Sequence, residues 1–454
     1  MILTNSNTTL LCAGAKAPPG SYWSGQFMVR SSDAGQTWSD PVKQSVGCDG
    51  EPIYSRTTNT IIRLGANPKK KRPRATSPTV TTLSPATERH AEAPLRNQAA
   101  LPGPKWAKDL TPLSASDLAK CESWLVKSTD EGKSWSDPQR ISVSGSLGPH
   151  YIGNGLNHGI EIQNGPYKGR LAAARRFDCP AAMGDHGRQE YFHSYVLYSD
   201  NQGANWTVGQ LLPQGSTECQ IAEMQNGSLL MTSRMYGSPW LSVPPKPSDL
   251  RRMFARSDDG GATWSEWWFV EQRQPAEGWT PGTIWTGTCD QALASNPSVS
   301  PTMYYAHPGN DSHYYGKDDN GLARANYTLH QSHDGGASWE FVNRIYPLGA
   351  GYSDANIVPD PAAAGGYTLL MSFQKTFNPP VQGVEGGGYD IAVARLPLPG
   401  NSESASCMPS GVACKPKLHQ CCTDLSCYPV YPRNISMGYV CGPGPPSSDS
   451  EKTA

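Results

Sequence analysis

The sequence contains no apolar run close to the roughly 18–20 residues that a transmembrane helix needs. Its start, MILTNSNTTLLCAG, also lacks the basic segment and the apolar core of a secretory signal. Charge is scarce as well, because only 17% of the 454 residues are charged and the formal net charge is −1. Such a chain creates no field that would gather nucleic acid or acidic lipid. We therefore expect no nucleic-acid partner, no membrane span and no cofactor.

Hydrophobic residues are also sparse, at 37%, whereas the chain has 46 glycines and 40 prolines. This composition is typical of turn-rich globular sequence rather than of disordered sequence. The length exceeds that of one ordinary domain, which has roughly 100–200 residues. A repeat architecture is therefore the first possibility to test.

One octapeptide pattern, Ser-x-Asp-x-Gly-x-Thr-Trp, recurs five times. The copies are SSDAGQTW from Ser31, STDEGKSW from Ser128, SDNQGANW from Ser199, SDDGGATW from Ser257 and SHDGGASW from Ser332. Each predicts a tight hairpin in which the Asp or Asn caps its own turn, Gly supplies a positive φ and Trp packs against a neighbouring strand.

A strand-like run precedes each octapeptide, and most copies are separated by roughly 60–75 residues, enough for one four-stranded blade. The segments GYTLLMSFQ and YDIAVARLPL predict a sixth blade without the octapeptide, closing on the TTLLCAG strand near the start. The sequence therefore predicts an all-β fold, a monomeric six-bladed β-propeller over residues 1–398. Residues 65–118, rich in Pro, Ser, Thr, Ala and Lys, predict a disordered insertion.

The C-terminal part has a different composition. Six cysteines have the spacing C-x6-C-x6-C-C-x4-C-x13-C, at Cys407, Cys414, Cys421, Cys422, Cys427 and Cys441. The pattern resembles an inhibitor cystine knot (knottin), and that resemblance implies the pairs Cys407–Cys422, Cys414–Cys427 and Cys421–Cys441. A zinc site is a weaker alternative, because His419 has no second His at ligand spacing. We expect a disulfide-rich module over residues 399–442 and a flexible tail over residues 443–454.

Crowded cysteines suit an oxidising compartment, as do six sequons for N-glycosylation. The sequons lie at Asn7, Asn205, Asn226, Asn310, Asn326 and Asn434. We therefore expect an extracellular or secretory-lumen protein whose natural chain begins upstream of Met1.

Four segments, together with the octapeptides, resemble the exo-sialidase (neuraminidase) family, in which the octapeptides are called Asp-boxes. They are residues 154–177, 216–236, 322–339 and 349–357. The resemblance implies a retaining glycosidase that removes terminal sialic acids from glycoconjugates. It makes Tyr352 the nucleophile, Glu218 its base, and Arg234 and Arg324 the substrate-binding arginines, whereas we expect His158 to be a structural hydrogen-bonding residue.

These residue types suit the substrate, because sialic acid bears a carboxylate on the carbon that reacts. Guanidinium groups bind a carboxylate through paired, charge-assisted hydrogen bonds. An anionic nucleophile would be repelled by that carboxylate, whereas a neutral Tyr can attack if a nearby carboxylate takes its proton. Tyrosine-using sialidases are an exception to the two-carboxylate scheme of glycosidases.

The chain departs from the family at three points. The family has a first arginine before the opening strand of blade one and an acid/base aspartate in the loop just after that strand, but residues 1–27 contain no Arg, Asp or Glu. Gln374 stands where the family has a glutamate that holds the first arginine. Three hypotheses remain open: a glycosidase with a relocated acid, a weak or inactive propeller that binds sialic acid as a lectin, and a purely structural scaffold.

Overall fold

The computed structural model describes residues 1–15, 25–44, 51–65, 124–141, 143–145, 157–177, 193–213, 215–235, 252–269, 292–308, 325–376, 389–399, 426–429 and 439–442. Every regular element in these ranges is a β-strand. None of the described residues forms a helix long and apolar enough to span a membrane. The predicted insertion over residues 65–118 falls outside the described ranges, apart from Gly65.

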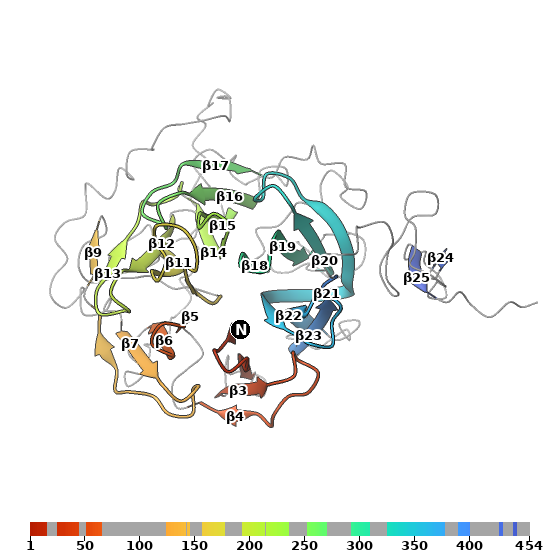
Figure 1. Ribbon diagram of the computed structural model, residues 1–454, viewed down its shortest axis with the longest axis horizontal. Coiled ribbons are helices and arrows are strands. Elements are labelled where there is room, and N and C mark those ends of the chain that lie inside the picture. The colour runs from red at the N-terminus through yellow and green to blue at the C-terminus, as the bar shows by residue number, and fades with distance from the viewer. Residues whose placement is uncertain are drawn as a thin grey trace, which may run out of the picture.

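The strands form six blades around a central axis (Figure 1). The first contains β1 (Ile2–Leu3), β2 (Thr9–Ala15), β3 (Gly25–Ser31) and β4 (Val42–Lys43), and the second contains β5 (Glu51–Ser55), β6 (Thr60–Gly65), β7 (Trp124–Ser128) and β8 (Gln139–Arg140). The third contains β10 (Ile160–Glu161), β11 (Leu171–Phe177), β12 (His193–Ser199) and β13 (Trp206–Val208), with β9 (Val143–Gly145) pairing in parallel with β13. The predicted six-bladed propeller is confirmed.

The fourth blade contains β14 (Ser216–Glu223), β15 (Leu229–Met235), β16 (Arg252–Ser257) and β17 (Glu266–Phe269). The last two blades form one continuous sheet of β18 (Ala292–Asn296), β19 (Ser300–Pro308), β20 (Ala325–Ser332), β21 (Glu340–Pro359), β22 (Tyr367–Thr376) and β23 (Tyr389–Pro397). They are joined because the first part of β21 pairs with β20 and the second part pairs with β22.

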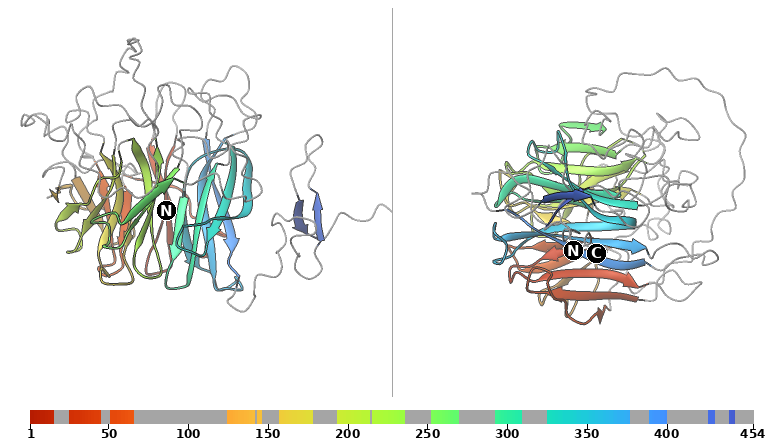
Figure 2. Two further views of the ribbon diagram at one scale, coloured as in Figure 1. Left: turned by 90° about the horizontal axis from the view of Figure 1, so that it is seen from above. Right: turned by 90° about the vertical axis from the view of Figure 1, so that its right-hand side faces the viewer.

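Each blade begins with its innermost strand, and the strands that follow one another along the chain within a blade are antiparallel, so the ring has two distinct faces (Figure 2). We call the end where the innermost strands begin the upper face. The octapeptide turns follow the third strand of a blade and lie at the other end, the lower face. This chain direction decides which side chains meet at each end of the axis.

The five octapeptide turns share one set of hydrogen bonds. In the first turn Ser31 Oγ donates to Asp33 Oδ1 at 2.7 Å and accepts the Gly35 amide at 2.8 Å, and the Thr37 amide donates to Asp33 Oδ1 at 2.9 Å. The fourth and fifth residues of this turn have a positive φ, which is 55° at Ala34 and 77° at Gly35. The sequence predicted the positive φ at Gly35 but not at Ala34.

The glycine of each turn packs against the preceding blade. A Cβ added at Gly35 would lie 2.9 Å from Leu370 of the sixth blade, and one at Gly203 would lie 2.9 Å from Ile62 of the second. Gly261 similarly abuts Val196 of the third blade. The turns therefore join consecutive blades, and a side chain at these glycines would both clash and strain the backbone.

The ring closes on the predicted TTLLCAG strand, through packing and not through hydrogen-bonded pairing. The segments that we assigned to the sixth blade do pair, as β22 and β23, but β2 pairs only with β1 and β3 among the described strands. Closure comes instead from side-chain packing, in which Leu3, Leu11, Val358 and Leu370 form one buried cluster. Residues of similar shape interdigitate here without a shared hydrogen-bond ladder.

Near the C-terminus the structure describes one antiparallel pair, β24 (Ser426–Pro429) and β25 (Tyr439–Gly442). Its backbone register sets Cys427 opposite Cys441. The other four cysteines of the predicted knot, Cys407, Cys414, Cys421 and Cys422, lie outside the described residues. The three disulfide pairs and the boundaries of the module therefore stay predictions.

Candidate active site

Glu218 occupies an irregular position near the start of β14, at the upper face. The pairing of β14 with β15 shifts between Thr217 and Cys219, so Glu218 is the extra residue of a β-bulge. Its φ is 40°, a conformation that non-glycine residues adopt rarely. Bulges re-aim side chains, and backbone strain of this kind gathers at functional sites.

Tyr352 lies at a second bulge. The register of β21 against β22 shifts between Gly351 and Ser353, so Tyr352 is the extra residue of a β-bulge. Gly351 is paired with Gln374, which places the Gln374 backbone next to this bulge. Both predicted catalytic residues therefore leave the regular two-residue alternation of an inner strand.

The two bulges bring their side chains together. The Tyr352 hydroxyl donates a hydrogen bond of 3.2 Å to Glu218 Oε1, although 134 positions separate the residues in the chain. Arg234, which pairs with Thr217 across β14 and β15, places Nη1 2.6 Å from Glu218 Oε2. The Glu218 side chain is only 5% exposed, so these contacts take place largely away from water.

A second arginine contacts the same carboxylate, and the sequence analysis missed it. Arg176, near the end of β11, places Nη1 3.2 Å from Glu218 Oε1 and 3.3 Å from Thr217 Oγ1. The pattern LAAARRF gave a signal, because strand alternation puts Arg176 on the same face as Ala172 and Ala174, which pack toward β14. We call Tyr352, Glu218, Arg234 and Arg176 the upper cluster.

Arg324 lies outside the described residues, immediately before β20. The other three site residues predicted from the sequence, Tyr352, Glu218 and Arg234, are in contact as described above. Their assignment as catalytic and substrate-binding residues, and that of Arg324, stay predictions.

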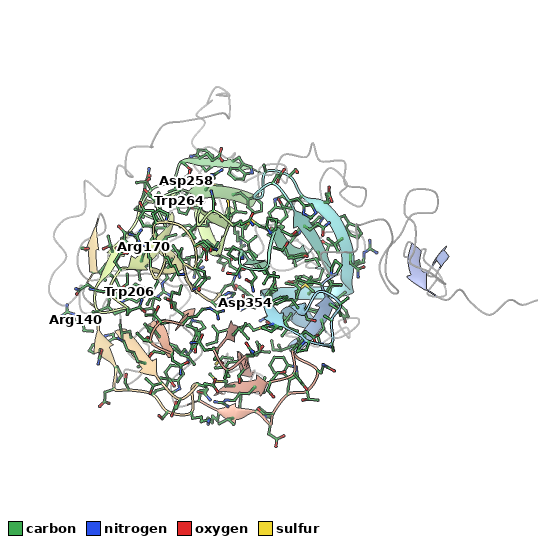
Figure 3. The ribbon with its side chains drawn as sticks, viewed as in Figure 1. Arg140, Arg170, Trp206, Asp258, Trp264 and Asp354 are labelled. Atoms are coloured by element: carbon green, nitrogen blue, oxygen red, sulfur yellow. The ribbon has the colours of Figure 1, made fainter. Side chains whose placement is uncertain are left out.

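A layer of buried polar residues lies two positions further along the inner strands, toward the lower face. Asp354 lies close to the centre of the ring (Figure 3) and its Oδ1 is 2.8 Å from His158 Nδ1 and 3.0 Å from Gln220 Nε2. Burial raises the pKa of Asp354, but its electrostatic interactions and hydrogen bonds, first among them those with His158, outweigh burial and hold the pKa below its usual range. His158 thus makes the structural hydrogen bond expected of it.

A cavity of about 300 Å³ lies further toward the lower face, lined by residues from the innermost strand of every blade. Two of its lining residues are carboxylates that already have partners. Glu223 accepts the amides of Gln163 and Asn164 at 2.8 and 2.7 Å, and Glu161 accepts the Thr57 amide at 3.1 Å. Burial raises the pKa of Glu223. These carboxylates fix loops of the ring, and the cavity is separate from the upper cluster.

The upper cluster has the groups that nucleophilic catalysis requires. A hydroxyl hydrogen-bonded to a carboxylate can lose its proton as it attacks. Guanidinium groups beside that carboxylate favour its charged form and also attract an anionic ligand. Among the described residues no group of His, Cys, Asp and Glu could hold a metal ion.

The family model described as BNR repeat-like domain matches residues 110–363, more than half of the chain. The chain is 25% identical over 217 residues to a sialidase of Bacteroides fragilis, covering 47% of this chain and 33% of that protein. It is 32% identical over 142 residues to an anhydrosialidase of Macrobdella decora, covering 31% and 16%. The matches thus span at most a third of these two relatives' own length.

Solved structures of sialidases share the fold. The Hadza microbial sialidase Hz136 superposes with a TM-score of 0.53 at 17% identity, covering 87% of this chain and 64% of that one. The Trypanosoma rangeli sialidase in complex with the inhibitor DANA superposes with a TM-score of 0.50 at 14% identity, covering 86% and 53%. At these identities the likeness concerns the propeller architecture alone.

Proposed function

The chain belongs to the family of BNR repeat-like domains, and from that premise we propose that it is a sialidase-type glycoside hydrolase. Its substrates would be glycoconjugates that end in sialic acid, and it would retain the anomeric configuration. The observation that carries the proposal is the hydrogen bond of 3.2 Å between the Tyr352 hydroxyl and Glu218 Oε1. The sialidase names of the curated relatives support it.

In the first step Tyr352 Oη attacks the anomeric carbon while the glycosidic C–O bond breaks, and the leaving oxygen keeps the electron pair. The hydroxyl proton of Tyr352 passes to Glu218 Oε1, and solvent protonates the leaving oxygen. In the second step water attacks the same carbon, the bond to Tyr352 breaks, and the tyrosine oxygen recovers its proton from Glu218. The proton lost by the water returns to solvent, which completes the balance.

Arg234 and Arg324 are the proposed ligands of the substrate carboxylate. Arg234 also holds Glu218 through the ion pair of 2.6 Å, so it would connect the bound substrate to the base. A charge-assisted contact this short fixes the carboxylate with respect to Tyr352. We propose no protein group as the acid that protonates the leaving oxygen.

The decisive experiment varies the leaving group. An aryl leaving group of low pKa needs little protonation, so we expect kcat/KM for an aryl sialoside to exceed that for a galactose-linked sialoside by about 10²–10⁴-fold. Tyr352→Phe should abolish turnover of both. Tyr54→Phe at the lower face, which loses the hydroxyl that accepts the Asn5 amide at 2.9 Å, serves as the matched control and should keep both rates.

Equal rates on the two substrates would reveal a general acid elsewhere in the chain. Retention of turnover by Tyr352→Phe would remove the tyrosine mechanism. If sialosides bind tightly but the aryl substrate is not turned over, during hours and between about pH 4 and 8, the protein is a sialic-acid-binding lectin and not an enzyme.

We also propose that the protein works outside the cell or in the secretory lumen. Cys12 is disulfide-bonded, which an oxidising compartment favours. The described sequon residues Asn7, Asn205 and Asn226 are all exposed. Expression in a secreting host, followed by glycan mapping and disulfide mapping, tests the compartment and the three proposed cysteine pairs together.

A further inference from the structure

We propose that Arg176 is a substrate-binding residue that selects glycosides bearing a carboxylate at the anomeric carbon. The inference rests on the proposed function, since it assigns a further residue to the same site. Arg176 enters from the third blade, whereas Glu218 and Arg234 belong to the fourth and Tyr352 to the sixth. The upper cluster is thus assembled from three blades.

The local structure directs Arg176 toward the cluster. Arg176 pairs with Ser194 on β12, and strand alternation turns its side chain toward β14. Ala172 and Ala174 precede it on the same face, and their small side chains let β11 and β14 approach closely. The contact of 3.3 Å with Thr217 Oγ1 then holds the guanidinium beside Glu218.

Two properties distinguish Arg176 from Arg234. Its side chain is 17% exposed, compared with 10% for Arg234, so it is the more accessible of the two arginines. Its contact with Glu218 is 3.2 Å, whereas that of Arg234 is 2.6 Å. The looser and more accessible ion pair is the one that an incoming carboxylate exchanges more readily, while the shorter pair keeps the base in place.

Charge makes the exchange favourable. Arg176 contacts Glu218 Oε1 and Arg234 contacts Glu218 Oε2, so each oxygen of this carboxylate is paired with a guanidinium group. A substrate carboxylate that reaches Arg176 forms the same kind of pair in a largely buried environment, where electrostatic interactions are stronger than in water. When Arg176 turns to the substrate, its guanidinium leaves Glu218 Oε1, whereas the hydrogen bond from the Tyr352 hydroxyl stays. Because a positive charge beside it is gone, this oxygen accepts the tyrosine proton more readily.

The test measures binding rather than turnover, so it does not depend on catalysis. In a Tyr352→Phe background, calorimetry compares the methyl α-glycoside of sialic acid with its C1 methyl ester, a neutral analogue of nearly the same shape. We expect the acid to bind at least tenfold more tightly than the ester. Arg176→Gln should weaken binding of the acid by about 10–100-fold and change the affinity for the ester by less than about threefold.

Arg176→Lys keeps the charge but loses the forked donor, so it should recover part of the affinity for the acid. Arg256→Gln removes an exposed arginine that pairs with Asp258 at the lower face and should change neither affinity. Thermal unfolding of each variant identifies any that fail to fold.

Equal losses for the acid and the ester in Arg176→Gln would overturn the proposal, because a structural role affects both ligands alike. No preference for the acid in the protein with Arg176 intact would overturn it as well. Acid-selective binding that Arg176→Gln removes, in a protein that hydrolyses no aryl sialoside, would support Arg176 and refute only the enzyme. If the protein hydrolyses sialosides but the Arg176→Gln variant still binds the acid more tightly than the ester, only the role of Arg176 is refuted.

Discussion

At the lower face of the propeller five turns repeat the same hydrogen bonds, whereas at the upper face Glu218 and Tyr352 each occur once, at bulges of different blades. Every octapeptide Asp or Asn accepts bonds from within its own turn, and the pKa values of Asp33 and Asp130 are lowered to about 2, mainly by their hydrogen bonds to Thr37 and Ser134. Glu218 receives its partners from β11, β15 and β21.

The comparison teaches how a repeat fold acquires a single site. Local hydrogen bonds can be copied from blade to blade, because each turn needs only its own eight residues. A site on the axis needs side chains from different blades, so the copies must diverge where they meet. Three predictions test this contrast between the two faces, and they follow in order of decreasing expected effect.

Glu218→Gln tests the upper face most strongly. An amide cannot take the Tyr352 proton, so kcat/KM for an aryl sialoside should fall by about 10²–10⁴-fold. The matched control is Glu223→Gln, which changes a buried glutamate on the same strand, where the carboxylate accepts two backbone amides. This control should lose about 1–3 kcal/mol of stability with little change in rate. Equal loss of rate in both variants would contradict the functional difference between the two faces.

Acid should affect buried histidines before it affects the octapeptide turns. Burial lowers the pKa of His193 to about 4 and that of His330 to about 3, so both stay neutral in the folded protein while the unfolded chain binds protons below about pH 6.5. Stability should therefore fall as the pH falls from 6.5 toward 4, by about 3 kcal/mol at most for His193. The octapeptide carboxylates, whose folded pKa values are lowered, should lose their contribution only below about pH 4.

Urea unfolding at a series of pH values measures this dependence. His193→Asn keeps a donor for the Leu212 carbonyl but has no titrating group, so it should reduce the slope between pH 6.5 and 4 by roughly half and leave the contribution of His330. An unchanged slope would mean that His193 is protonated in the folded protein.

Ser257→Ala is the smallest change, at the lower face. Ser257 Oγ donates to Asp259 Oδ1 and accepts the Gly261 amide, each at 2.8 Å, so the variant leaves a buried amide without that partner. We expect a loss of about 1–2 kcal/mol in the free energy of unfolding and an unchanged kcat/KM. Ser265→Ala, which removes an exposed hydroxyl just outside the octapeptide that bonds the Arg256 carbonyl and the Asp258 carboxylate, is the control.

The sequence predicted the propeller because its signals are local: the turn chemistry of Ser31 to Trp38 and its copies can be identified without knowing the rest of the chain. It predicted the Tyr352–Glu218 contact only through a family resemblance. Arg176 was missed because the alternation in LAAARRF indicates which face of the strand the residue is on, but not that this face meets Glu218 of the next blade. The sequence also predicted which strand closes the ring, but not that Leu370 and Leu11 meet there through packing and without pairing.

The length of β21 has a mechanical consequence. Its 20 residues, Glu340–Pro359, belong to the fifth blade at one end and to the sixth at the other, with Tyr352 in the second part. Peeling β22 away from β21 therefore disturbs the strand that also holds β20, so the two blades share one opening event. In hydrogen exchange the amides of these two blades should open together, while the first four blades, each a separate sheet, open individually. Tyr352 would thus lie in the part of the ring whose blades separate least easily from each other.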